Sequence, residues 1–246
     1  MNLIQYKNHG GLGTITINRM EKANALSRVM VEKFSKILDT VASDIDMRVL
    51  VITGAGDRVF CAGADLSELA SETNTRSNAE AFDEVWDGLT EKISALPFLT
   101  IAALNGTCAG GGLSLALSCD IRIATENAHL FYPALRNGVV PAAADLRRFH
   151  ALIGPSKTKM LMMSGVDLHA SEALAWGLLD RSVGSDDLEK TITDLTAIPL
   201  AAPRSKIVGM KRMISGFEDP SIVSDCYDTV YGGDQNALER LWSIKS

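Results

Sequence analysis

One turn constrains the fold and the chemistry of this 246-residue chain more than any other segment. The run Asn105-Gly106-Thr107-Cys108-Ala109-Gly110-Gly111-Gly112 follows an apolar segment at residues 99–104 and leads directly into another at residues 113–117. This pattern predicts a strand, a glycine-rich turn and the start of a buried helix. The first N–H groups of a helix lack intrahelical partners and carry partial positive charge, and consecutive glycines let another molecule approach them. The turn therefore predicts a site for an oxygen that is, or becomes, negative.

The same glycines also have a purely structural interpretation, a tight turn with close packing of helix on sheet, and the turn alone does not decide between the two. The common phosphate motifs do not match. The chain has no Gly-x-x-x-x-Gly-Lys-Ser/Thr here, and the four glycines at 106 and 110–112 do not have Gly-x-Gly-x-x-Gly spacing. A nucleotide phosphate at this turn is therefore disfavoured.

Composition limits the class of protein. With 46% hydrophobic residues the chain can bury a large core. Its formal net charge of −6 argues against a nucleic-acid partner, and no apolar run reaches the ~18 residues that a membrane span needs. The first residues lack the layout of a signal peptide. We expect a cytoplasmic protein with no nucleic-acid or membrane partner.

The four cysteines, Cys61, Cys108, Cys119 and Cys226, are widely spaced, with no Cys-x-x-Cys pair. Neither a zinc site nor a disulfide framework is indicated, and no other metal site is expected. This cysteine usage fits a reducing compartment.

Hydrophobic periodicity predicts alternating strands and helices in the first half of the chain. Strands are expected at residues 3–7, 12–18, 48–53, 99–104 and 121–124, and helices after a Ser27 cap, at 79–96 and at 113–118. This alternation implies an α/β fold with a mainly parallel sheet. From Ser156 onward the pattern is almost wholly helical. We expect a core at residues 1–190 and a C-terminal helical subdomain at 191–246 of the kind that packs against a neighbouring subunit.

A second loop makes the glycine turn more specific. After the buried strand at 48–53, small residues at 61–64 again permit close approach to the backbone, and Asp65 stands where a helix can begin. Together with this loop, several blocks of sequence in fixed order resemble the enoyl-CoA hydratase/isomerase (crotonase) family. The blocks are Asn24-Ala25-Leu26, Phe60-Cys61-Ala62-Gly63-Ala64-Asp65-Leu66, Asn105-Gly106 with the glycines at 110–112, Ser118-Cys119-Asp120-Ile121-Arg122-Ile123-Ala124, Gly138-Val139-Val140-Pro141 and Glu172-Ala173-Leu174-Ala175-Trp176-Gly177-Leu178.

The resemblance runs from about residue 12 to residue 185 and implies a crotonase-like spiral of ββα turns. It implies a helical C-terminal region that builds a homotrimer or homohexamer. It also implies an acyl-CoA substrate, in which coenzyme A is part of the substrate and no separate cofactor is required. By position, the backbone N–H groups of Ala62 and Gly111 are expected to form an oxyanion hole around the thioester carbonyl. Such donors bind an enolate oxygen more tightly than a thioester oxygen, because the enolate carries more charge.

The resemblance also implies a set of substrate-binding residues along the CoA path. They are Lys22, Ala25, Ala62, Gly63, Ala64, Asp65, Leu66, Gly110 and Gly111. Lys206 and Lys211 are further candidates for the CoA phosphates. For each lysine, a solvated surface charge is the competing interpretation.

Two positions depart from the family pattern. The family's hydratases use two glutamates to hold and activate water, and the matching positions here are Ser114 and Ala134. A serine hydroxyl has a pKa far from neutrality and alanine has no proton to give, so neither replaces a carboxylate. Efficient hydration of a 2-enoyl-CoA is therefore not expected.

A third departure lies in the next loop. Where relatives have Pro-Gly-x-Gly-Gly, this chain has Pro141-Ala142-Ala143-Ala144-Asp145. Asp145 is a candidate for acid–base chemistry, with a helix N-terminal charge as its structural alternative. The candidate catalytic positions are thus Ala62, Gly111, Ser114, Ala134 and Asp145. Nearby Glu68, Tyr132, Arg136 and Arg147 are further polar candidates, for each of which a structural role is favoured over a catalytic one.

Three functions remain open. The first is an acyl-CoA enzyme that stabilises a thioester enolate and catalyses isomerisation, decarboxylation or carbon–carbon cleavage. The second is a non-catalytic member of the same fold that binds acyl-CoA or assists assembly. The third is a serine hydrolase, because the sequence around Ser114 approaches Gly-x-Ser-x-Gly and three histidines could supply a base. These are His129, His150 and His169.

Overall fold

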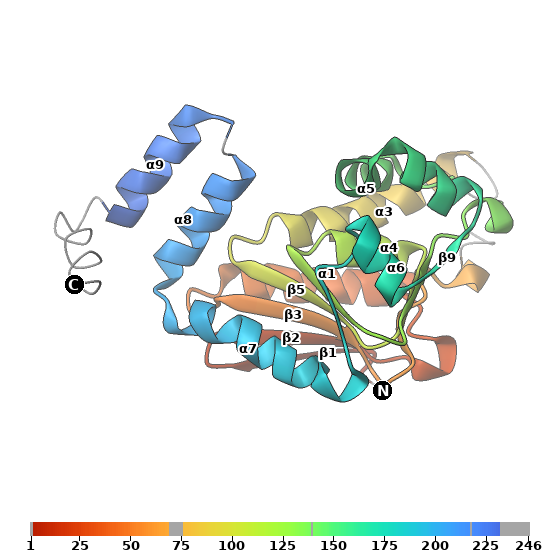
Figure 1. Ribbon diagram of the computed structural model, residues 1–246, viewed down its shortest axis with the longest axis horizontal. Helices are drawn as coiled ribbons and strands as arrows, with labels where there is room; N and C mark the ends of the chain where they lie inside the picture. Colours follow the sequence, from red (N-terminus) through yellow and green to blue (C-terminus); the bar gives the residue numbers. More distant parts are fainter. Residues whose placement is uncertain (1, 69–75, 139, 217, 232–246) are drawn as a thin grey trace.

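The computed structural model describes residues 2–68, 76–138, 140–216 and 218–231. Its main sheet has six strands in the order β1-β2-β3-β5-β7-β10 (Figure 1). β1 and β2 form an antiparallel hairpin, and every other neighbouring pair is parallel. The strands are β1 (Ile4–His9), β2 (Leu12–Ile17), β3 (Val49–Gly54), β5 (Leu99–Leu104), β7 (Ile121–Thr125) and β10 (Arg181–Val183).

A second sheet of four short strands lies at the carboxyl ends of β3, β5 and β7. Its order is β4-β6-β8-β9, with β8 and β9 antiparallel. The strands are β4 (Val59–Cys61), β6 (Thr107–Ala109), β8 (His129–Phe131) and β9 (Asp167–His169). Each of the first three follows a main-sheet strand after a short turn, so the chain repeats the unit strand, turn, strand, and a helix follows β4 and β6.

Helices occupy both faces of the main sheet. Those described are α1 (Arg28–Ser43), α3 (Arg76–Ser94), α4 (Gly111–Leu117), α5 (Ala143–Met163), α6 (Ala170–Trp176), α7 (Leu188–Ala201), α8 (Arg204–Ser215) and α9 (Pro220–Tyr231). Three short 3-10 turns, η1 (Met20–Lys22), η2 (Leu135–Asn137) and η3 (Ser185–Asp187), connect them. The Ser27 hydroxyl accepts a hydrogen bond from the Met30 N–H at 3.4 Å, which confirms the predicted cap of α1.

The core is divided by the sheet. Alternate residues of each strand point to opposite faces. On β3, Leu50 and Ile52 pack with α1 and α3, whereas Val49 and Val51 pack against α7. Both groups are buried, which explains the uninterrupted apolar run of this strand.

The core of the fold extends further along the chain than predicted, because it includes α7. The predicted boundary between residues 190 and 191 falls inside this helix, and α7 covers one face of the sheet through Leu188, Ile192 and Leu195 (Figure 1). The helices that extend away from the sheet are α8 and α9. Residues 232–246 of the predicted subdomain lie outside the described part of the chain.

The strand–helix alternation of the first half is confirmed, with the predicted boundaries either exact or shifted by at most three residues. The expectation of an almost wholly helical chain from Ser156 onward is wrong in two places, β9 and β10. Three-residue strands have too little periodicity to be recognised locally, and they exist because a neighbouring strand, β8 or β7, offers unpaired backbone groups. None of the helices in the described part of the chain has the length and apolar character that crossing a membrane requires.

Candidate active site

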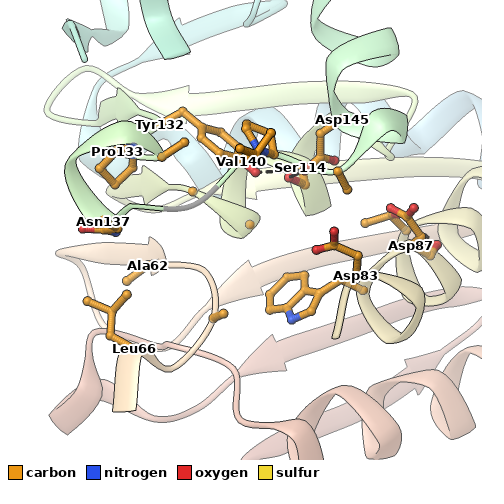
Figure 2. Close-up of a pocket in the computed structure, with 18 of the residues that line it drawn as sticks. Ala62, Leu66, Asp83, Asp87, Ser114, Tyr132, Pro133, Asn137, Val140 and Asp145 are labelled. Carbon is orange, nitrogen blue, oxygen red and sulfur yellow. Dashed lines mark hydrogen bonds between the residues drawn. The ribbon is translucent and has the colours of Figure 1, made fainter. Parts of the chain in front are cut away.

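A cavity of about 350 Å³ lies where the two sheets meet the helices (Figure 2). Its walls come from the loop after β4, from α3, from the start of α4, from the segment after β8 and from the start of α5. The lining residues are Ala62, Ala64, Leu66, Asp83, Trp86, Asp87, Thr90, Gly110, Gly111, Ser114, Tyr132, Pro133, Ala134, Asn137, Gly138, Val140, Pro141, Ala142 and Asp145. Most of this lining is apolar, and its polar groups are mainly carboxylates and hydroxyls.

The two small-residue loops predicted from the sequence abut one another at the cavity. A Cβ at Gly63, which has φ +92°, would lie 2.8 Å from the Gly111 nitrogen and 3.0 Å from the Ala109 oxygen. A Cβ at Gly112 would lie 2.3 Å from the Cys61 oxygen. Glycine is therefore required on both sides of this contact, because any side chain would push the two backbones apart.

The backbone hydrogen bonds of these loops correct one predicted donor. The Ala62 N–H donates to the Ala23 carbonyl at 3.1 Å, so it is not available to a ligand. The flanking N–H groups of Asp65 and Gly63 are also used, by the Leu26 oxygen and the Cys61 sulfur. In contrast, the N–H groups of Ala64 and Gly111 donate to no residue that the structure describes. Both residues line the cavity, so the available donor pair is Ala64 and Gly111 rather than Ala62 and Gly111.

Every second residue of the loop after β4 lines the cavity. Ala62, Ala64 and Leu66 line the cavity, whereas Asp65 points to the other side and pairs with Arg19 at 2.8 Å. Asp65 also accepts hydrogen bonds from the Ser67 N–H at 3.0 Å and the Ser67 hydroxyl at 2.5 Å. These hydrogen bonds, with the Arg19 charge, lower the pKa of Asp65 to about 2. Asp65 therefore holds the loop and does not contact the cavity, contrary to its predicted place among the substrate-binding residues.

The other predicted CoA contacts lie outside the cavity lining. Lys22 is exposed in η1, and Ala25 is buried with its carbonyl accepting from Arg19 at 3.2 Å. The two lysines of α8 bind within the chain: the Lys206 Nζ donates to the Val230 carbonyl at 3.1 Å, and the Lys211 Nζ pairs with Asp120 at 2.7 Å. Of the three lysines predicted to bind the CoA phosphates, Lys22 is therefore the one that is exposed and whose side chain has no partner among the described residues.

Asp145 is the anchored carboxylate of the cavity. Its Oδ2 accepts hydrogen bonds from the Ser114 hydroxyl at 2.5 Å and from the Tyr132 hydroxyl at 2.9 Å (Figure 2). The Arg148 Nη1 lies 3.5 Å from Oδ1, and Asp145 itself is only 6% exposed. Three elements, α4, α5 and the segment after β8, therefore fix one buried carboxylate in the wall of the cavity.

This network changes the interpretation of two residues. Tyr132 is not merely structural: it lines the cavity, and burial together with the Asp145 charge raises the pKa of its phenol far above its ordinary value, so it remains a donor. Ser114 lies inside α4, and its hydroxyl donates a hydrogen bond to a carboxylate rather than to a histidine. Since the cavity is lined by no histidine of the described residues, the serine hydrolase hypothesis has no base to support it.

The opposite wall belongs to α3. Asp83, Trp86, Asp87 and Thr90 are spaced three or four residues apart and so share one face of the helix. The Trp86 ring packs on the glycine turn, because a Cβ at Gly111 would lie 2.7 Å from it. Burial raises the pKa of both aspartates, with the neighbouring charge of Asp145 adding to the effect. No sequence motif marks Asp83 or Asp87, and the only sequence signal is their spacing on one helical face.

The fold and the two converging loops can be compared with known proteins. The family model described as enoyl-CoA hydratase/isomerase matches residues 7–219. The chain belongs to the enoyl-CoA hydratase/isomerase family. It is 31% identical over 195 residues to the short-chain-enoyl-CoA hydratase of Clostridium acetobutylicum, a match that covers 79% of this chain and 74% of that protein.

Solved structures of the family agree over nearly the whole chain. The crystal structure of an enoyl-CoA hydratase from Bacillus anthracis matches with a TM-score of 0.89 at 29% identity, covering 99% of this chain and 96% of that one. An enoyl-CoA hydratase/carnithine racemase from Magnetospirillum magneticum matches with a TM-score of 0.91 at 28% identity, covering 100% and 93%. The predicted crotonase-like α/β fold is therefore confirmed.

Within this family member, the two positions expected to carry glutamates in hydratases both reach the cavity. Ser114 and Ala134 are lining residues, each 2% exposed. Ala134 presents only a methyl group, whereas Ser114 presents a hydroxyl that already donates a hydrogen bond to Asp145. The carboxylate nearest to position 114 is thus supplied by α5.

Proposed function

We propose that this family member isomerises the double bond of an acyl-CoA thioester through an enolate. One observation carries the proposal: the same cavity holds two unengaged backbone donors, Ala64 and Gly111, and one anchored carboxylate, Asp145. The donors suit a thioester oxygen that gains charge, and the carboxylate suits a carbon that loses a proton.

The proposed steps follow from these groups. The Asp145 carboxylate removes a proton from Cα of a 3-enoyl thioester, and the electron pair of the broken C–H bond passes to the carbonyl oxygen. The Ala64 and Gly111 N–H groups stabilise that oxygen, each by about 3 kcal/mol if they behave as typical oxyanion donors. Protonation at Cγ then moves the double bond into conjugation with the thioester. Ser114 and Tyr132 orient the carboxylate through its Oδ2, and Oδ1, which has Arg148 at 3.5 Å but accepts no hydrogen bond from a described hydroxyl, takes the proton.

The charges of the cavity favour isomerisation over decarboxylation. A substrate that loses CO₂ brings its own carboxylate into the cavity, where the Asp145 carboxylate would repel it. Hydration by the two-glutamate route lacks its residues, because positions 114 and 134 carry no carboxylate. A neutral enoyl chain meets neither obstacle.

We also propose that the CoA portion follows the loop after β4, with Ala62 and Leu66 along its path and Lys22 near its phosphates. Leu66 is 59% exposed, which places it at the open end of the cavity. We propose a homotrimer or homohexamer, since α8 extends from the body with Met210 and Ile214 exposed. Light scattering during gel filtration tests the assembly.

The function is tested with purified protein and a panel of thioesters. We expect conversion of 3-hexenoyl-CoA to 2-hexenoyl-CoA, with hydration of crotonyl-CoA at least about tenfold slower. Malonyl-CoA and a 3-ketoacyl-CoA cover decarboxylation and carbon–carbon cleavage. Binding of these esters in calorimetry without any turnover would instead support a non-catalytic acyl-CoA-binding protein.

A further inference from the structure

The cavity contains a second carboxyl group whose surroundings differ from those of Asp145. Asp83 projects into the cavity from α3, on the wall opposite Ser114 and Asp145 (Figure 2). Asp145 accepts two hydroxyl hydrogen bonds, whereas the Asp83 carboxyl makes no hydrogen bond or ion pair with any residue that the structure describes. One carboxylate is thus anchored and the other is free to exchange a proton.

We propose that Asp83 is a second catalytic residue, the acid that delivers a proton to the acyl chain from the wall opposite Asp145. This inference rests on the proposed isomerisation. It assigns the two halves of the proton shift to two different residues, instead of having Asp145 take the proton from one carbon and return it to another.

The surroundings of Asp83 favour its protonated form. Asp87 lies one turn further along α3 and Asp145 faces Asp83 from α5, and both negative charges disfavour ionisation of Asp83. Partial burial acts in the same direction and is the largest cause of the raised pKa. The other ionisable groups nearby are Tyr132, a neutral phenol, and three groups that act on the neighbouring Asp87, namely the Glu91 carboxylate and the Arg147 and Arg148 guanidiniums. Asp145 accepts two hydroxyl hydrogen bonds and Asp83 accepts none from the described residues, and two carboxyl groups in such different environments suit the roles of base and acid.

Asp145 takes the Cα proton, and the C–H electron pair forms the enolate held by Ala64 and Gly111. The Asp83 O–H bond then breaks and its proton bonds to Cγ, while the enolate electrons re-form the carbonyl and shift the double bond. Asp145 ends protonated and Asp83 ends ionised, and both return to their starting forms by proton exchange with solvent.

The test follows deuterium placed on Cα of 3-hexenoyl-CoA during turnover in ordinary water. With two residues, the new hydrogen at Cγ comes from solvent, so we expect no deuterium at Cγ of the product. In Asp83→Asn we expect kcat to fall about 100-fold, as typical for the loss of a general acid. The residual product should then carry deuterium at Cγ, because Asp145 must return the proton that it took.

The matched control is Glu84→Gln, which removes one charge from the exposed side of the same helix and should keep both the rate and the label pattern of the unmodified protein. In the unmodified protein, ionisation of the acid makes kcat/KM fall at high pH, and this fall should be absent in Asp83→Asn. Thermal unfolding checks that the variant folds. A normal rate in Asp83→Asn, or deuterium at Cγ with the unmodified protein, overturns the role of Asp83 and leaves Asp145 as the single base. No turnover of 3-hexenoyl-CoA by the unmodified protein overturns the isomerisation itself, and the role of Asp83 with it.

Discussion

The two halves of the cavity are built in different ways. The oxyanion side consists of backbone: two loops meet through Gly63 and Gly112, and the N–H groups of Ala64 and Gly111 remain available. The proton-transfer side consists of side chains from three separate elements, with Ser114 and Tyr132 fixing Asp145. Backbone geometry is encoded locally by glycines, whereas a side-chain network requires distant segments to pack correctly. The backbone side should therefore be sensitive to shape and the side-chain side to charge.

The largest expected effect comes from charge. Asp145→Asn preserves the shape of the side chain but removes the base, so we expect kcat for 3-hexenoyl-CoA to fall about 10³-fold with little change in KM. Asp186→Asn, at an exposed position of η3, is the control. If Asp145→Asn kept more than a tenth of the activity, Asp145 would not be the base, and proton transfer would not belong to the side-chain half of the cavity.

The next effect comes from shape. Gly63→Ala adds a Cβ 2.8 Å from the Gly111 nitrogen, which displaces one donor of the oxyanion side. We expect kcat/KM to fall about 100-fold, as for the loss of one oxyanion donor. Gly165→Ala is a matched control, because Gly165 also has a positive φ, +66°, but open space around it. Equal losses of activity in the two variants would assign the effect to backbone strain alone.

A smaller effect on catalysis is expected from losing the Tyr132 hydrogen bond that orients Asp145. Tyr132→Phe removes one of the two hydroxyl donors to Asp145 and leaves the ring that packs edge-on against Phe149. A hydrogen bond to a charged group contributes about 1.5–3 kcal/mol, so we expect kcat to fall at least about tenfold. Steady-state kinetics with a circular-dichroism check of folding measures it. An unchanged kcat would mean that Ser114 alone orients the carboxylate.

The smallest effect concerns stability and not catalysis. The pKa of Asp65 is lowered from 3.8 to about 2, so its ionised form stabilises the fold above pH 4 and this contribution is lost as the pH falls from about 4 to 2. We expect Asp65 to account for about 1 kcal/mol of the stability lost between pH 6 and pH 3, roughly half of its full contribution, as measured by urea unfolding. Asp65→Asn should unfold more readily at pH 6 and show a weaker pH dependence. An identical pH dependence in the variant would contradict the contribution of the ionised Asp65 carboxylate, with its Ser67 hydrogen bonds and Arg19 ion pair, to stability.

Much of the backbone side could be predicted from the sequence. The glycine run and the small residues at 61–64 are local signals, and they identified both loops and their approach. The exact donor could not be predicted, because availability of an N–H depends on what else contacts it. The Ala23 carbonyl, from a segment almost forty residues earlier, occupies the Ala62 N–H and leaves that of Ala64.

The side-chain side was only partly predictable. Asp145 stood out because it follows an altered Pro141 loop, but its partners did not. Tyr132 has the spacing of an ordinary core residue, and Asp83 and Asp87 have the spacing of an ordinary helical face. Nothing local indicates that α3 and α5 place their carboxyl groups in one cavity, since the two positions are about sixty residues apart in the chain.

The sequence by itself determined the order of strands and helices, the two loops that meet at the glycine turn, and the loss of both hydratase glutamates. These follow from local rules: hydrophobic period, the absence of Cβ atoms and the identity of residues at fixed positions. Only the tertiary structure decided that Ala64 and Gly111 hold the available N–H groups, that Ser114 serves Asp145, and that Asp83 faces them. The physical reason is that hydrogen-bond partners and desolvation depend on packing between distant segments, which no local pattern records.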